Sequence, residues 1–484
     1  MVRPAYCLPR RGGARCRAMI RIRHAAAVLL AATTALPALA ADATEPAFRA
    51  LYKELVETNT VVNSGSCTKA AAQVAARMKA AGFTDDQLVQ FAVPEHPEDG
   101  GLVAILPGTD KRKKPMLLLA HIDVVEAKRE DWQQDPFTLV ESDGFFTARG
   151  VADDKAMAAI FADSLIRLKQ SGTKLRRTVK LALTCGEETS GAFNGAEWLA
   201  NNRRELIDAE FALNEGGGGR TNPDGTPEML ALQVGEKHYQ DYEVTATNPG
   251  GHSSRPVPDN AIYELAAALK AVEAHRFPVR LNETTRAFFA AVALTRPGEL
   301  GDAMAAIARN GEDSAASTIL SKDPTLNAML RTTCVATQVA AGHAQNALPQ
   351  RAVANVNCRI IPGETVETTL SALQAAIGNP AVKVVPKATR NKIAIQPPMT
   401  PAIVNPAKAL AKVHFPGVPI FPTMVVGATD GPFLSAVGIP VYGVPGILYE
   451  ADGGGVHGLN ERIRVSSILN GRAYLHDLVI AYAK

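Results

Sequence analysis

Residues 116–125 read MLLLAHIDVV, a short apolar run that ends in a histidine and an aspartate. Nearly continuous apolar runs are typical of central strands that are covered on both faces. The runs LVAIL at 102–106 and VKLALT at 179–184 have the same character, and helical patterns at 154–171 and 191–205 follow the later strands. This alternation predicts an α/β domain with a mixed, mainly parallel sheet.

The strand pattern changes near residue 236, where a β-branched, alternating segment ends at GGHSSRP. A helix at 259–275 and a helical stretch at 283–330 are expected next, before two more alternating strands. From about residue 395 the first pattern returns. We therefore expect a catalytic domain in two pieces, 41–235 and 395–484, interrupted by an inserted α+β domain at 236–394.

The N-terminus has the composition of a secretory signal peptide. Arg21 and Arg23 precede the run AAAVLLAATTALPALA, which ends in the small-residue site Ala38-Leu39-Ala40. The run is too short for a stable membrane span, although an uncleaved anchor is the alternative. We expect residues 1–40 to be removed and the protein to be secreted or periplasmic, with Met19 as an alternative start.

Charge and cysteine content narrow the range of partners and of metal ligands. Removing the seven arginines of residues 1–40 leaves 44 basic against 48 acidic residues, without a basic stripe, which argues against nucleic acid as a partner. The remaining cysteines have no zinc-ligand spacing, so any metal must use histidine and carboxylate ligands. Cys334 and Cys358 lie in two strands that could pair, and a disulfide there stays an open alternative.

Residues of the metal-ligand type follow several of the predicted strands. His121 ends its strand, and Asp123 lies on the same face, where its carboxylate can bind the far ring nitrogen of the histidine. Glu187 and Glu188 follow a second strand, and Glu215 follows a third. Because ligands bind at the carboxyl ends of strands in open α/β sheets, we expect these side chains to meet at one edge.

Two further segments add to this set. Asp153 and Asp154 begin a predicted helix, and His457 lies in the glycine-rich loop GGGVHGLNE. Each segment has a simpler explanation, since an aspartate can cap a helix and a histidine can complete a turn. A carboxylate can also bridge two cations, and two histidines with several carboxylates form the ligand set of a hydrolytic dinuclear zinc site.

These motifs resemble a family of dinuclear-zinc metallopeptidases that includes aminoacylase, glutamate carboxypeptidase, carnosinase-like dipeptidases and succinyl-diaminopimelate desuccinylase. The motifs HID, W-x-x-DPF, ARG-x-x-DDK, GEE, NEG and a distal HG occur in the family's order between about residues 50 and 480. The resemblance implies a zinc-exopeptidase-like catalytic domain. It also implies that residues 236–394 form a lid, through which a homodimer would assemble.

The resemblance implies two Zn²⁺ ions per chain, with Co²⁺ or Mn²⁺ as substitutes. His121 and Glu215 would complete one site, Glu188 and His457 would complete the other, and Asp153 would bridge both. The peptide bond that follows Asp153 would be cis.

The resemblance also implies roles in catalysis and in substrate binding. Glu187 would be the general base and then the proton donor, and Asp123 would orient the first histidine ligand. The lid histidine His252, which comes from the partner subunit in dimeric relatives, would stabilise the oxyanion, although the residue alone reads as a loop histidine. Arg359 would grip the substrate carboxylate. Two polar residues, Asn346 and Thr429, would line the substrate site.

Two departures from the family pattern lie close to the motifs, Ala156 in place of glycine and Glu126 in place of proline. Neither is a ligand position. The lid is longer than usual, because the helical stretch at 283–330 is added to it.

The expected function is cleavage of the amide bond next to a free carboxylate in short peptides, by an exopeptidase, dipeptidase or carboxypeptidase that uses a metal-bound water as nucleophile. An N-acyl-amino-acid amidohydrolase needs the same machinery and is the close alternative. An inactive binding protein on the same fold is the remote one.

Overall fold

The computed structural model describes residues 42–189, 191–389 and 392–484. Residues Thr44–Lys484 form one compact unit, which contains all the helices and strands described below. The expected signal peptide at 1–40 lies outside the described residues. Within the described ranges, the structure contains no helix of the length and apolarity needed for a membrane span.

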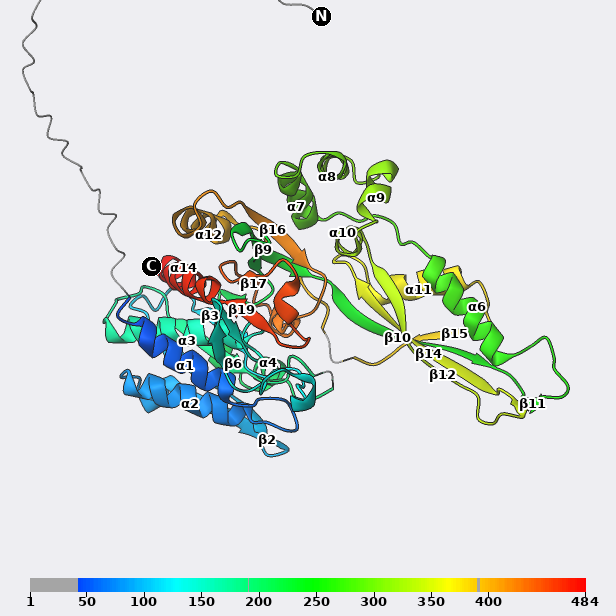
Figure 1. Ribbon diagram of the computed structural model, residues 1–484, viewed down its shortest axis with the longest axis horizontal. Coiled ribbons are helices and arrows are strands. Elements are labelled where there is room, and N and C mark those ends of the chain that lie inside the picture. Colours follow the sequence, from blue (N-terminus) through cyan, green and yellow to red (C-terminus); the bar gives the residue numbers. More distant parts are fainter. Residues whose placement is uncertain (1–41, 190, 390–391) are drawn as a thin grey trace, which may run out of the picture. The chain divides into compact units, whose positions relative to one another are not determined.

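A ten-stranded mixed sheet forms the centre of this unit (Figure 1). Its middle strands β6, β3, β7 and β17 are parallel, and antiparallel pairs flank them, as the sequence predicted. Strands β3 and β6 are buried along their whole length. The order is β1-β2-β6-β3-β7-β17-β9-β8-β18, with β16 paired to β9, and the strands are β1 Leu88–Val93, β2 His96–Leu106, β3 Met116–His121, β6 Val179–Thr184, β7 Phe211–Asn214, β8 Gly218–Thr221, β9 Pro227–Glu236, β16 Ile420–Val425, β17 Val441–Gly443 and β18 Leu448–Tyr449.

Helices cover both faces of this sheet. Leu118 of β3 belongs to a core shared with α1, α2, α3, α12 and α14, whereas its neighbour Leu117 belongs to a second core shared with α4, α5 and α13. This division follows from the two-residue period of a strand, which sends alternate side chains to opposite faces. The helices are α1 Glu45–Glu57, α2 Cys67–Ala80, α3 Lys155–Gln170, α4 Gly195–Asn202, α5 Arg204–Ile207, α12 Pro401–His414, α13 Gly431–Ala436 and α14 Val465–Ala483.

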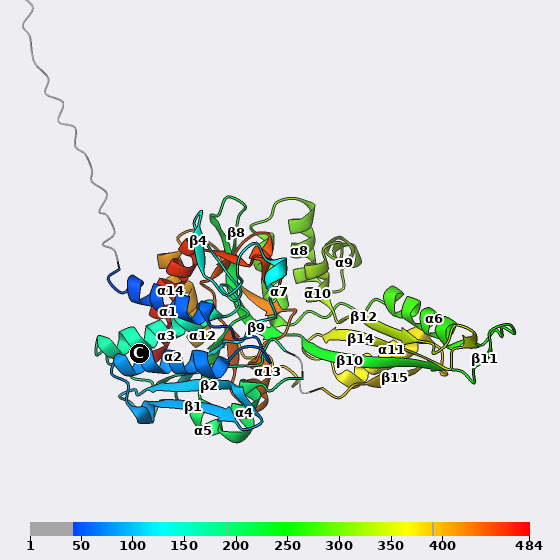
Figure 2. The same cartoon turned by 60° about the horizontal axis from the view of Figure 1, so that its bottom comes forward.

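A four-stranded antiparallel sheet with the order β12-β14-β10-β15 corresponds to the expected lid (Figures 1 and 2). Helices α6 and α11 pack on one face, where Tyr242, Val356 and Leu373 are fully buried. A two-stranded pair, β11 with β13, lies at the far end of this sheet from β3 and β6 in both views. The bounds are β10 His238–Thr247, β11 Gly251–His252, α6 Ala261–Ala274, β12 Thr333–Ala341, β13 Ala347–Leu348, β14 Arg351–Ile360, α11 Val366–Ile377 and β15 Lys383–Pro386.

The expected helical stretch at 283–330 is four short helices with a core of their own. This core includes Phe421 of β16 and no residue of the four-stranded sheet, so the helices pack on the edge of the large sheet. The domain boundaries at 236 and 394 stay predictions. The helices are α7 Glu283–Ala293, α8 Glu299–Arg309, α9 Ser314–Leu320 and α10 Pro324–Leu330.

A small three-stranded sheet and three short 3-10 helices complete the fold. The sheet has the order β19-β5-β4, and it joins the C-terminal segment to the chain before α3. The bounds are β4 Val140–Ser142, β5 Phe145–Thr147, β19 Arg462–Arg464, η1 Asp85–Gln87, η2 Arg129–Asp131 and η3 Gly453–Gly455.

Two disulfides join neighbouring elements. Cys334 and Cys358 lie directly opposite each other on β12 and β14 and are bonded, so the open alternative from the sequence is realised. A second bond, between Cys67 and Cys185, was not predicted and joins the start of α2 to the residue after β6. This second bridge ties an N-terminal helix to the turn that contains Glu187.

Candidate metal centre and active site

Three strands of the large sheet end at one edge, and each delivers a ligand-type side chain there. His121 is the last residue of β3 and is paired in register with Thr184, the last residue of β6. Glu187 and Glu188 follow β6 within four residues, and Glu215 follows β7 directly. Because β6, β3 and β7 are parallel neighbours, these side chains meet.

Asp153 lies between two histidines. Its Oδ1 is 3.1 Å from His121 Nε2, and its Oδ2 is 3.1 Å from His457 Nε2. His457 Nε2 is also 2.9 Å from Glu188 Oε1, and His121 Nε2 is 3.8 Å from Glu215 Oε2. The two oxygens of one carboxylate therefore face two separate ligand pairs, which is the arrangement of a group that spans two cations.

The ligand atoms also form two overlapping groups in which every pair lies within 4.8 Å. One group joins His121, Glu187 and Glu215, and the other joins His121, Asp153 and Glu188. These groups would make Glu187 a ligand, in contrast to the expected general base. The contact of His457 with Glu188 favours the expected assignment, in which these two residues bind the second cation and Glu187 is the general base, because each cation then has one histidine ligand.

The carboxylates of this cluster repel one another. Burial, followed by the charge of Glu215, raises the pKa of Glu187 well above its ordinary value. Burial likewise raises the pKa of Glu215 to about 7, although His121 opposes the shift. Burial would raise the pKa of Asp153 too, but its hydrogen bonds with the two histidines bring it below the ordinary value. A buried cluster of acids is stabilised by positive charge, and imidazole nitrogen with carboxylate oxygen is the donor set that Zn²⁺ accepts, so the residues fit a pair of divalent ions.

Asp123 is fully buried but contacts His121 differently from the expectation. The nearest acceptor to His121 Nδ1 is the backbone oxygen of Asp123, at 3.1 Å, whereas the carboxylate Oδ1 lies at 3.6 Å. The other carboxylate oxygen accepts a hydrogen bond of 3.0 Å from the backbone N–H of Glu188. Asp123 therefore holds both a histidine and a glutamate of the cluster.

Glu461 organises the loop that contains Asp153, a role that no sequence pattern predicted. Its Oε1 accepts hydrogen bonds from the N–H groups of Ala152 at 2.9 Å and Asp153 at 3.3 Å. Its Oε2 accepts from Gly150 N–H at 2.9 Å and from Arg149 Nη1 at 2.8 Å. The bond between Asp153 and the next residue is cis, as the family resemblance implied.

Asp154 immediately precedes α3, which is the position of a capping residue. Its side chain makes no capping hydrogen bond, and its Oδ2 is buried without a partner among the described residues. Helix capping therefore does not explain the aspartate pair.

A second buried network lies beneath the Glu187 turn. Asp430 accepts hydrogen bonds from Asn194 Nδ2 at 2.6 Å and from Thr184 Oγ1 at 3.1 Å, and Asn194 also donates to the backbone oxygen of Gly186. Burial raises the pKa of Asp430 to about 6, against the effect of Asn194. This network fixes the turn between β6 and α4.

Thr429 and Glu236 form a pair beside this network. Thr429 Oγ1 donates to Glu236 Oε2 at 2.7 Å, and burial raises the pKa of Glu236 to about 8. Glu236 is a single acid at the end of β9, where no motif marked it.

The expected substrate residues of the lid lie in two places. Arg359 is half-buried on β14, with its guanidinium carbon 4.6 Å from the centre of the Tyr239 ring, and its Nη1 has no hydrogen-bond partner in the described ranges. Burial lowers the pKa of Arg359, and the charges of Tyr239 and Asp241 oppose this effect. His252 and Asn346 are exposed at the β11–β13 tip, where the backbone oxygen of Asn346 accepts a bond from the residue after His252. Their side chains do not join the carboxylate cluster.

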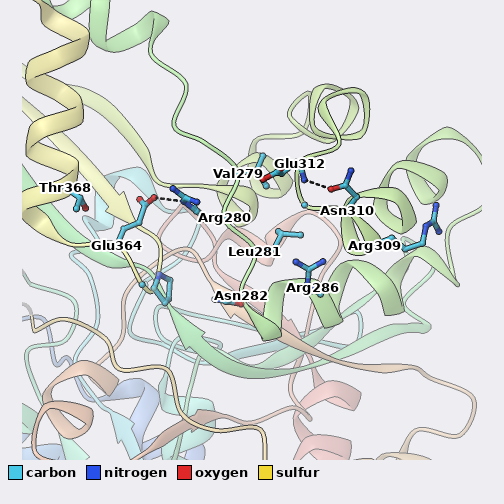
Figure 3. A pocket seen from close by; sticks show the side chains of 13 residues that line it. Val279, Arg280, Leu281, Asn282, Arg286, Arg309, Asn310, Glu312, Glu364 and Thr368 are labelled. Carbon is cyan, nitrogen blue, oxygen red and sulfur yellow. Dashed lines mark hydrogen bonds and ion pairs between the residues drawn. The ribbon is translucent and has the colours of Figure 1, made fainter.

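A cavity of about 800 Å³ lies away from this cluster, between α7, α8 and the segment before α11. Figure 3 shows Arg280 pointing toward Glu364, with an N–O distance of 3.7 Å, while Arg286 and Arg309 come from α7 and α8. Its lining has no histidine or cysteine.

Comparisons with known proteins agree with this geometry. The family model for peptidase family M20/M25/M40 matches residues 117–481. The N-fatty-acyl-amino acid synthase/hydrolase PM20D1 of Xenopus tropicalis is 30% identical over 79% of this chain and 75% of its own length. The probable carboxypeptidase S-like 2 of Dictyostelium discoideum is 29% identical over 74% and 70%. The M20 metallo-carboxypeptidase Sso-CP2 of Sulfolobus solfataricus has the same fold, with a TM-score of 0.68, 17% identity, and coverage of 90% of this chain and 99% of that one.

Proposed function

The chain belongs to peptidase family M20/M25/M40 and is a hydrolase, and we propose that it cleaves the amide bond next to a free carboxylate in short peptides. The observation that carries the proposal is the position of Asp153, whose two oxygens face two histidines from distant parts of the sequence. In this proposal His121 and Glu215 hold one metal ion, and Glu188 and His457 hold the other. Members of this family bind two metal ions; we propose Zn²⁺, with Co²⁺ or Mn²⁺ as substitutes.

Bound divalent ions would polarise the scissile carbonyl and lower the pKa of adjacent water. Glu187 takes a proton from the attacking water at its carboxylate and then gives this proton to the leaving amine. Its placement beside His121 and Glu215 brings its carboxylate to the proposed cation pair, where it can bind and release a proton. Asp123 keeps the turn in place by accepting the backbone N–H of Glu188, and Asp430 does so through Asn194, which donates to the backbone oxygen of Gly186.

Arg359 binds the substrate carboxylate in this proposal. A guanidinium with an unsatisfied buried nitrogen gains a strong, planar hydrogen bond when a carboxylate arrives. Thr429, paired with Glu236, lines the same site.

We propose that residues 236–394 act as a lid and that a second copy of the chain supplies His252 and Asn346. Both residues are exposed on the β11–β13 tip, and this tip lies at the far end of the four-stranded sheet from β3 and β6 (Figures 1 and 2). A partner subunit would bring the imidazole to the oxyanion of the other copy.

The second candidate is hydrolysis of an N-acyl amino acid. The observation that favours it is the similarity to the N-fatty-acyl-amino acid synthase/hydrolase, at 30% identity. The machinery is the same, because an N-acyl amino acid also presents an amide next to a free carboxylate. A panel of dipeptides and N-acyl amino acids measures which class the enzyme prefers.

The protein is further proposed to be secreted or periplasmic, after loss of residues 1–40. Two disulfides among the described residues suit an oxidising compartment. N-terminal sequencing of the exported protein tests the cleavage after Ala40.

The test of the mechanism is Glu187→Gln, with Glu205→Gln on an exposed part of α5 as the control. We expect elemental analysis to find about two metal ions per chain in both variants. Hydrolysis should fall by a factor of about 10²–10⁴ only in Glu187→Gln. If turnover survives, Glu187 is not the base; if the metal content drops instead, Glu187 is a ligand. If the metal-loaded wild-type protein hydrolyses no member of the panel, the protein is an inactive binding protein on this fold.

A further inference from the structure

A partly open, mostly apolar cavity begins next to Glu215, a metal ligand in the proposed function. It has a volume of about 480 Å³, and Gly216, the residue after Glu215, forms part of its wall. Helices α7, α8 and α10 and strand β16 enclose the rest. Its size is within the range of about 300–1,000 Å³ that is typical of small-molecule sites.

The wall of this cavity is mostly apolar and rich in methionine. Four of the ten methionines in the chain line it, together with Phe288 and Val292 of α7. Methionine side chains are flexible and polarisable, so they adapt to apolar ligands of varied shape. The four are Met229 of β9, Met304 of α8, Met329 of α10 and Met424 of β16.

The charged residues at the cavity already have partners within the protein. Arg220 Nε lies 2.6 Å from Glu228 Oε2, and Arg296 Nη2 lies 3.3 Å from Glu228 Oε1. Asp323 caps α10 by accepting the N–H of Leu326 at 2.9 Å. These groups therefore have little hydrogen-bonding capacity left for a peptide backbone. A peptide bound in the cavity would have its own polar groups unpaired.

The cavity has room to continue away from the metal ligands. A second cavity of about 500 Å³ reaches Phe421 and Pro419, and Met229, Val292, Arg296 and Leu300 line both. Shared lining residues make the two cavities neighbours. A long, thin ligand can thus extend from the first into the second.

We propose that this cavity binds the hydrocarbon chain of the acyl group in an N-acyl amino acid. The proposal rests on the second candidate function above, and it assigns the binding site for that chain. The two ends of such a substrate need opposite surroundings, since the carboxylate needs a cation and the chain needs apolar walls. Arg359 on β14 supplies the cation for the carboxylate. Helices α7, α8 and α10 supply the apolar walls for the hydrocarbon chain, beside Glu215.

The helices at 283–330 then determine substrate choice. They add no metal ligand to the described cluster, and their core is separate from that of the lid sheet. Removing their apolar surface from the edge of the large sheet would leave β16 and Met229 open to water on this side. In this proposal, the side chains of these helices therefore set the length of acyl chain that the cavity accepts.

The test uses the metal-loaded enzyme with N-acetyl-, N-octanoyl-, N-lauroyl- and N-palmitoyl-phenylalanine. We expect kcat/KM to rise from acetyl to lauroyl by about a hundredfold or more, because each buried methylene contributes roughly fourfold and burial of about three or four methylenes is enough for that factor. Leu300→Trp places an indole where the two cavities meet and should lower the lauroyl-to-acetyl ratio by about tenfold. Ala290→Trp adds the same bulk on the exposed face of α7 and should leave that ratio unchanged.

A binding measurement separates this proposal from the function on which it rests. Titration of N-lauroyl-phenylalanine into metal-loaded Glu187→Gln protein should give a dissociation constant that Leu300→Trp raises by about tenfold. Met304→Ala, which enlarges the cavity, should shift the preference toward palmitoyl, and it serves as a second variant if Leu300→Trp does not fold. If the enzyme hydrolyses N-acetyl-phenylalanine but its kcat/KM does not depend on the length of the acyl chain, the cavity assignment is wrong and the hydrolase function still stands. Failure to hydrolyse any amide would reject the enzymatic function itself.

Discussion

Glu461 provides the sharpest prediction about the metal centre. Its carboxylate accepts four hydrogen bonds, three from backbone N–H groups of the loop at 150–153 and one from Arg149. The side chains of Arg149 and Glu461 are only 3% and 1% exposed. Substitution Glu461→Gln replaces one acceptor oxygen by an amide that donates, so a buried guanidinium or two backbone donors lose their acceptor.

The expected loss follows from this burial. Breaking one side of a buried charge pair costs about 3–5 kcal/mol, so the free energy of unfolding should fall by about that amount. Because the same carboxylate holds the N–H of Asp153, the bridging aspartate should also lose its orientation. Loss of a group that orients a metal ligand lowers metal affinity by about 10–100-fold.

The assay measures stability and metal affinity separately. Urea unfolding gives the first, and competition with a chromogenic zinc chelator gives the second. Glu450→Gln is the matched control, because Glu450 is also buried and bound to an arginine, Arg464, but has no contact with the loop at 150–153. We expect the control to lose stability without losing metal affinity. If Glu461→Gln keeps the zinc affinity of the wild-type protein, the positioning role is wrong.

Two further predictions concern the disulfides and the lid arginine. The double substitution Cys67→Ser with Cys185→Ser should lower the free energy of unfolding by about 5 kcal/mol. Removal of the Cys334–Cys358 bond should lower it by only about 3.5 kcal/mol, because this bond closes a shorter loop. Equal losses measured by urea unfolding would contradict the chain-entropy explanation. Arg359→Ala should raise KM by about 10–100-fold for substrates with a free carboxylate and have little effect on amidated ones, whereas Arg351→Ala, at the exposed start of the same strand, should affect neither. Equal effects of Arg359→Ala on both substrate types would reject the carboxylate-binding role.

The sequence predicted the sheet and the cluster for the same physical reason. MLLLAHID and VKLALT are apolar on both faces, so they had to be covered strands, and parallel neighbours must end at a common edge. His121, Glu187, Glu188 and Glu215 follow from that rule alone. His457 does not, because it lies in a glycine-rich loop, and it joined the expected ligand set through its residue type and the family resemblance.

The parts that could not be predicted depend on contacts between distant segments. Glu461 and Asp153 are 308 residues apart, and Cys67 and Cys185 are 118 residues apart. Local patterns contain no information about such pairs. The helical stretch at 283–330 was recognised, but its division at Pro297-Gly298 and Asn310-Gly311 was not predicted, although both dipeptides are turn signals, and its packing on β16 is a contact between distant segments.

The loop with His457 and Glu461 has a consequence for biosynthesis. Both side chains lie among the last 28 residues of the chain, whereas His121 and Asp153 emerge from the ribosome hundreds of residues earlier. A nascent or truncated polypeptide that stops before this loop lacks one imidazole and the acceptor for the amides at 150–153. In the proposed site, the second cation therefore gains its histidine ligand only once the loop with His457 has been made.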